Sequence, residues 1–152
     1  MIRMKYLITI LFVANASFSY AADTTSSSSG PAWLTEAQNE IKEKNYDSAV
    51  KTLLAANEPN SADWNNLLGF AQRKKSPPDL NAAERYYQAA LKIDPKHKGA
   101  LEYYGELFLM KNDLPGAEQM LARLNKVCIF SCEEYRDLKE EIAKYKAKKG
   151  SK

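Results

Sequence analysis

Three segments decide the fold of this chain: YDSAVKTLLAA (46–56), LNAAERYYQAAL (80–91) and LPGAEQMLARL (114–124). Each has a small residue with apolar residues four and seven positions later, which places all of them on one face of a helix. A fixed period of 34 residues relates the segments and indicates a stack of similar helical units. The equivalent positions are Ala49, Ala83 and Ala117; Leu53, Tyr87 and Leu121; and Ala56, Ala90 and Leu124.

A second amphipathic segment precedes each of these helices. Apolar residues recur every three or four positions, and Val and Ile are sparse, so the sequence predicts helices and no strand. Gly69 and Gly105 fall in the middle of two of these first helices, where glycine costs about 1 kcal/mol relative to alanine. We expect close approach of a partner helix to compensate. The preceding segments are residues 33–45, 62–75 and 97–112.

This 34-residue helix–turn–helix unit resembles the tetratricopeptide repeat. The resemblance implies an all-α fold, with three repeats in a right-handed solenoid and a capping helix at the C-terminal end. The stretch KKSPPDLN (74–81) departs from the motif, because it lengthens the turn inside the second unit by two residues. The resemblance is carried by Trp33, Ala37, Tyr46, Ala49, Leu53 and Ala56 in the first, degenerate unit; by Leu68, Gly69, Ala83, Tyr87, Ala90 and Pro95 in the second; and by Gly105, Phe108, Ala117 and Leu121 in the third.

The predicted organisation places the repeats between a leader and a terminal helix. The terminal helix has acidic residues early and lysines late, which suits the helix dipole, and a solenoid needs such a helix with a polar outer face at its end. The predicted segments are a signal peptide (1–21), a flexible Ser-rich linker (22–31), the three repeats (32–60, 61–96 and 97–130), the capping helix (131–149) and a tail (150–152).

The first 21 residues have the layout of a secretory signal peptide. Arg3 and Lys5 precede an apolar run over residues 6–14, and Ser19-Tyr20-Ala21 fits the cleavage pattern. Since this run is well under the ~20 residues of a spanning helix, we expect an exported protein, periplasmic in a Gram-negative bacterium, with no stable membrane anchoring after cleavage. Cleavage would leave 20 basic and 19 acidic residues, a balance that argues against a nucleic-acid partner.

Cys128 and Cys132 are the chain's two cysteines and lie where the third repeat passes into the capping helix. In an oxidising compartment a structural disulfide across this turn is the favoured interpretation. A redox centre stays open, because a thiolate at a helix N-terminus has a lowered pKa. A metal site stays open too, although it needs two more ligands and His97 is the single histidine. Short exported bacterial repeat proteins are similar in this Cys…Cys-Glu-Glu-Tyr segment, and that resemblance favours the structural role.

The family resemblance also implies a binding site, because the first helices of tetratricopeptide repeats line a concave groove that takes peptides or partner segments. Phe70 and Arg73 are of the types that dominate interface energetics, and we expect them to share an outward face. The other interpretation of this stripe is a solvated helix surface. The groove residues carried over are Gln38 and Ile41, beside Leu34, in the first unit; Asn66, Phe70 and Arg73 in the second; and Glu102, Glu106 and Leu109 in the third.

The sequence shows no Ser/His/Asp arrangement, no phosphate-binding glycine loop and no cluster of metal ligands. We therefore expect no enzyme activity and no cofactor. The predicted function is an exported adaptor or scaffold that binds a protein or peptide, whose identity no residue pattern names. The alternative is an envelope thiol-redox or metal-handling factor that uses Cys128 and Cys132.

Overall fold

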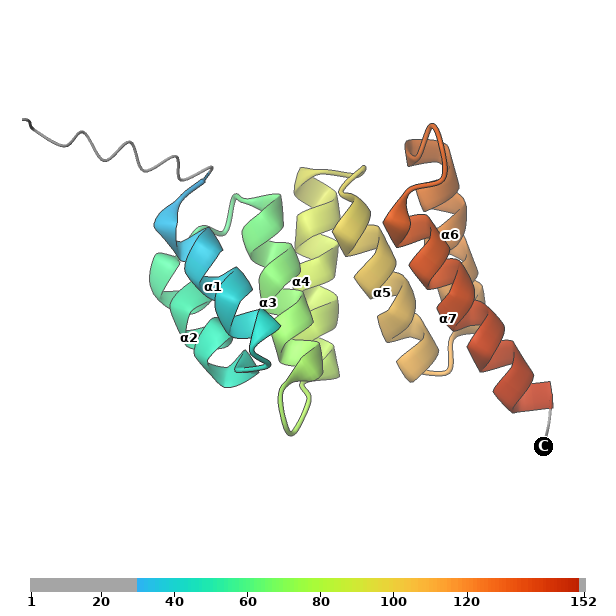
Figure 1. Ribbon diagram of the computed structural model, residues 1–152, viewed down its shortest axis with the longest axis horizontal. Helices are drawn as coiled ribbons and strands as arrows, with labels where there is room; N and C mark the ends of the chain where they lie inside the picture. The colour runs from blue at the N-terminus through green and yellow to red at the C-terminus, as the bar shows by residue number, and fades with distance from the viewer. Residues whose placement is uncertain (1–29, 151–152) are drawn as a thin grey trace, which may run out of the picture.

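The computed structural model describes residues 30–150, and within this range α-helices joined by short loops are the regular secondary structure (Figure 1). The predicted all-α class and the helical repeats are confirmed. The predicted signal peptide and residues 22–29 of the predicted linker lie outside the described residues. The helices are α1 (Ala32–Lys42), α2 (Tyr46–Ala56), α3 (Ala62–Lys74), α4 (Leu80–Ile93), α5 (Lys98–Met110), α6 (Leu114–Val127) and α7 (Glu133–Gly150).

The helices form two layers that follow the repeats. The pairs α1–α2, α3–α4 and α5–α6 are the three repeats, and each pair packs together. The odd-numbered helices also contact one another in sequence, from α1 through α3 and α5 to α7, and this layer faces the viewer in Figure 1. Helix α7 continues the odd-numbered layer and packs on both α5 and α6. It therefore covers the last repeat, as the capping role requires.

Backbone hydrogen bonds inside each repeat account for the regular period and its one departure. In the first and third repeats, the residue before the second helix donates its N–H to a carbonyl five residues earlier, and in the second repeat to one seven residues earlier. The KKSPPDLN stretch thus adds two residues to the turn, as predicted, and the second helices stay in register. The bonds run from Asn45 to Glu40 (2.8 Å), from Asp79 to Gln72 (2.9 Å) and from Asp113 to Phe108 (2.8 Å).

The two glycines in the first helices are places of close approach, as expected. A Cβ at Gly69 would lie 2.6 Å from the ring of Tyr87 on α4. A Cβ at Gly105 would lie 2.5 Å from a methyl carbon of Leu138 on α7. Tyr87 and Leu138 are both fully buried, so these contacts join the helices at the centre of the hydrophobic core.

Helix α7 begins at Glu133, two residues after the predicted start of the capping segment at residue 131. The first backbone bond of this helix runs from the Arg136 N–H to the Cys132 carbonyl (3.2 Å), which leaves Cys132 just outside the helix. Leu138 and Ile142 are buried against the last repeat. Among residues 30–150, no helix has the length and apolar character to cross a bilayer.

Candidate functional site

A row of three aromatic side chains crosses the middle of the molecule. Tyr46 opens α2, Phe70 lies near the end of α3, and Tyr103 lies in α5. The ring centroids of Tyr46 and Phe70 are 6.2 Å apart, and those of Phe70 and Tyr103 are 4.7 Å apart. All three side chains are half-buried, so each keeps part of its surface accessible. The row links the first, second and third repeats and offers apolar surface to a partner.

Arg73 lies against this row and is buried. Its guanidinium carbon is 5.5 Å from the centroid of the Phe70 ring and 5.7 Å from that of Tyr103, within cation–π range. Its Nη1 lies 2.6 Å from Glu106 Oε2, and the residue is only 5% exposed. The predicted outward face of Arg73 is therefore wrong. Because α3 and α5 lie side by side, the long side chain spans the space between them instead of reaching solvent.

Two further residues of the predicted groove are also buried, since Asn66 and Glu102 are each 7% exposed. Asn66 lies against α5, with its Nδ2 3.1 Å from the position of a Cβ at Gly99, and Glu102 faces Glu134 and Asp137 of α7. Their role in a binding groove stays a prediction. Phe70, Glu106, Leu109 and Ile41 are half-buried, and Gln38 is exposed.

Only some of the predicted groove residues contact one another in the structure. Phe70, Arg73 and Glu106 form one contact network. Gln38 and Ile41 lie on α1, and in the part of the chain described here no hydrogen bond, ion pair or ring contact connects them to that network. Tyr103 belongs to the network, although the predicted stripe passes beside it through Glu102 and Glu106. Its one sequence signal is a spacing of 33 residues from Phe70, close to the repeat length.

The same face is acidic where α5 meets α7. Burial, together with the charges of Glu106, Asp137 and Glu134, raises the pKa of Glu102 to about 8, while Arg73 acts in the opposite direction. Burial also raises the pKa of Tyr103 to about 12, with Glu102 and Glu106 adding to the effect. The face therefore combines an aromatic part, between α3 and α5, with an acidic part, between α5 and α7.

Several polar atoms around this site lie buried without a hydrogen-bond partner among the described residues. They include Asn66 Oδ1 and Gln72 Oε1. The Arg73 guanidinium and the Tyr87 hydroxyl lie close together, and a hydrogen bond between them acts on the pKa of both groups. A buried donor or acceptor without a partner costs roughly 1–3 kcal/mol. These groups make the interior behind the aromatic row unusually polar for the core of a helical repeat.

Cys128 and Cys132 lie in the loop between α6 and α7, with their Sγ atoms at disulfide distance, 1.95 Å apart, and their Cα atoms 5.6 Å apart. Ile129 and Phe130, between them, are each 89% exposed. Within residues 30–150, no group of three or more His, Cys, Asp or Glu side chains is arranged to hold a metal ion. The two cysteines are close enough for a disulfide, and its structural role stays a prediction.

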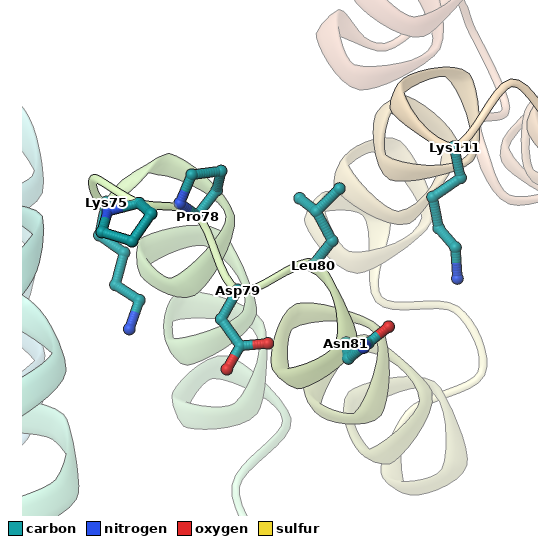
Figure 2. Close-up of a pocket in the computed structure, with 7 residues that line it drawn as sticks. Lys75, Pro78, Asp79, Leu80, Asn81 and Lys111 are labelled. Atoms are coloured by element: carbon teal, nitrogen blue, oxygen red, sulfur yellow. The ribbon is translucent and has the colours of Figure 1, made fainter.

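A separate hollow of about 570 Å³ lies at the lengthened turn between α3 and α4. Figure 2 shows its side chains spread along the turn, with Lys75 and Asp79 on one side and Lys111 approaching from the end of α5. Lys111 forms a close ion pair with Glu84, so its charge is already engaged. The hollow is lined by Lys75, Pro77, Pro78, Asp79, Leu80, Asn81 and Lys111.

Comparisons with known proteins agree with the fold. Residues 79–141 match the family model described as Tetratricopeptide repeat. A search of curated proteins finds no significant match. Among solved structures, the chain is similar to the type III secretion translocator chaperone SycD of Yersinia enterocolitica, with 19% identity, a TM-score of 0.66, and coverage of 78% of this chain and 83% of that chain. It is also similar to SycD in complex with a peptide of the translocator YopD, with 20% identity, a TM-score of 0.62, and coverage of 77% and 92%. The fold is that of a tetratricopeptide-repeat solenoid.

Proposed function

We propose that this tetratricopeptide-repeat chain is an exported, non-catalytic adaptor or scaffold that binds a segment of another protein on the face formed by α3, α5 and α7. The observation that carries the proposal is the half-buried aromatic row of Tyr46, Phe70 and Tyr103. Aromatic side chains bring large apolar contact areas and are enriched among the residues that dominate binding energy.

The comparisons support a protein or peptide as the partner. SycD has the same fold and is a chaperone that is seen in complex with a peptide of YopD. The signal-peptide layout of residues 1–21 supports export. The acidic part of the face argues against nucleic acid, whose phosphates would be repelled.

Site-specific photocrosslinking tests this proposal. Lys74 is exposed on α3, with its Nζ 5.6 Å from the centroid of the Phe70 ring. A photoreactive amino acid at position 74 should crosslink a partner in an envelope extract. The same group at Lys92, exposed on α4 in the other layer, should not. Crosslinks of equal yield from positions 74 and 92 would place binding elsewhere.

Phe70→Ala then measures the contribution of the aromatic row. We expect this variant to lose about 2 kcal/mol or more of affinity for the crosslinked partner, the level of an interface hot spot. Lys92→Ala should change the affinity by less than about 1 kcal/mol, as is usual for a solvated charge. Circular dichroism of both variants would show that the helices remain. Unchanged affinity for Phe70→Ala would refute the site.

A thiol-redox factor is the second candidate, favoured by the closeness of Cys128 and Cys132 in an accessible loop. Mass measurement with and without reductant separates the two candidates. A disulfide that resists a glutathione buffer indicates a structural bond, whereas a pair that cycles readily indicates a redox role. Stoichiometric metal in the purified protein would favour the metal-handling form of this candidate.

A further inference from the structure

We infer that the bound segment presents a basic side chain, lysine or arginine, to the buried acceptors Glu102 and Asn66 on the face formed by α3, α5 and α7. This inference rests on the proposed function and specifies the chemistry of its partner.

The first observation is the Glu102 carboxyl. The residue is 7% exposed, and within residues 30–150 its carboxyl makes no side-chain hydrogen bond and no ion pair. The one basic side chain that acts on it electrostatically is Arg73, which is already paired with Glu106 at 2.6 Å. Burial of an ionisable group without a partner costs free energy. For the same reason, removal of one partner of a buried ion pair strongly destabilises a protein. Glu102 thus has capacity for a positively charged hydrogen-bond donor.

The second observation is independent and comes from α3. Asn66 is 7% exposed, and its Oδ1 is buried without a donor. The amide lies against α5, because its Nδ2 is 3.1 Å from the position that a Cβ of Gly99 would occupy. Gly99 precedes Glu102 by three residues, so the two lie on the same side of the helix. An acceptor on α3 and an acceptor on α5 therefore lie at one junction, each without a donor.

The side chains of lysine and arginine carry only donors, three and five respectively. An ionised carboxylate carries only acceptors, so it could not donate to the oxygens of Glu102 or Asn66.

The surrounding charges favour the same class of partner. The groups that face Glu102 are Glu106 and Tyr103 on its own helix, Glu134 and Asp137 on α7, and Arg73 on α3. Arg73 and Glu106 neutralise each other, which leaves the carboxylates of Glu134 and Asp137 as the surplus charge around Glu102. A face of one predominant sign raises the local concentration of an oppositely charged ligand.

Binding of a cation should release a proton. Burial holds the pKa of Glu102 near 8, so much of the carboxyl is protonated at neutral pH. A bound ammonium or guanidinium favours the ionised carboxylate and lowers that pKa. Affinity should therefore increase with pH, by roughly tenfold between about pH 6.5 and pH 8, and level off above this range.

Selection from a random peptide library displayed on phage, against the purified chain at pH 8, tests the inference. Three proteins are compared: wild type, Glu102→Gln, and the matched control Glu36→Gln on the exposed surface of α1. We expect wild type and Glu36→Gln to enrich peptides with a lysine or arginine at a fixed position. Glu102→Gln should lose that preference. The best wild-type peptide, measured by fluorescence anisotropy, should show the increase in affinity with pH, and Glu102→Gln should not.

The outcomes separate the inference from the proposed function. Enriched peptides without a basic preference, or a wild-type affinity that does not vary between pH 6.5 and pH 8, overturn the inference. If those peptides still require Phe70, the proposed function stands. If no peptide is enriched by any of the three proteins, both fail. The wild-type pH profile needs no variant, so a folding defect of Glu102→Gln would not obscure the result.

Discussion

Substitution of Gly69 by alanine sets two opposing effects against each other. In a helix interior, alanine is more favourable than glycine by about 1 kcal/mol. In this structure, the added Cβ would lie 2.6 Å and 2.7 Å from two ring carbons of Tyr87 and 3.0 Å from a third. These distances are far below the ~3.5–4.0 Å separation at which carbon atoms attract. The sign of the change in stability shows which effect dominates.

We expect the steric effect to dominate. Tyr87 is fully buried, and its ring is rigid, so it cannot move aside as the end of a flexible side chain could. Extra atoms in a packed core usually cost about 1–3 kcal/mol, and a rigid neighbour places the cost in the upper part of that range. After the gain in helix propensity, the net loss should be about 1–2 kcal/mol.

Urea denaturation followed by circular dichroism would measure this loss. Gly150→Ala is the control, because a Cβ at Gly150, at the end of α7, would have no neighbour within 4 Å. It should leave stability nearly unchanged. A Gly69→Ala protein about 1 kcal/mol more stable than wild type would refute the close approach, since helix propensity alone predicts that gain.

Three further predictions test the charged site and the loop. Arg73→Leu leaves Glu106 without its partner and should cost about 3 kcal/mol in the same denaturation assay; an unchanged midpoint would contradict the buried ion pair. Because the pKa of Glu102 is raised to about 8, the folded protein keeps a proton that the unfolded chain releases, so stability should fall as pH rises from about 4.5 to 8. The Glu102→Gln protein should lose less stability over this range, by up to about 1 kcal/mol per pH unit, and should be more stable than wild type above pH 8. An equal dependence of stability on pH in the two proteins would argue against the raised pKa. Serine at both Cys128 and Cys132 should cost ~2 kcal/mol, from the entropy of closing a loop of about five residues, and a reductant should lower wild type to the same value; no effect of the reductant would contradict the structural disulfide.

The fold was predictable because the repeat is visible in residues that cannot change without altering the packing. Ala49, Ala83 and Ala117 recur with a fixed period, and all three are fully buried. The longer turn of the second repeat was also predictable, because the three alanines keep their spacing in spite of it. Such positions pack against other residues of the same repeat. Both contacting residues therefore occur in the sequence at a fixed spacing, which makes the contact predictable.

Packing at the end of the solenoid was less predictable. Tyr87 fills the space beside Gly69, but the equivalent Leu121 is only half-buried. Leu138 of α7 lies against Gly105 instead. The period ends with the third repeat, so the register of α7 against α5 depends on the loop that contains the cysteines, and no sequence spacing specifies it.

The sequence indicates which helix face carries the residues of the candidate site, but not how deeply they are buried. A helical period identifies the face on which Asn66, Arg73 and Glu102 lie, but not how near the next helix stands. In the structure, α5 lies between α3 and α7 in one layer, and these neighbouring helices enclose all three residues. The burial of Arg73 depends on the length of its side chain, on the planar ring of Tyr103 beside it and on the distance between the helices. The helical period does not specify that distance.

The burial of these polar residues argues for a functional origin. Replacement of a buried ion pair by apolar residues of similar volume is often neutral or stabilising, so the Arg73–Glu106 pair and the unpaired Glu102 are not needed to hold α3 and α5 together. The other buried polar residues, Asn65 and Gln72, lie on α3, and the remainder of the buried core is apolar. Local departures from such a pattern concentrate at functional sites. The departure here coincides with the accessible aromatic row, and the two features together support the proposed binding face.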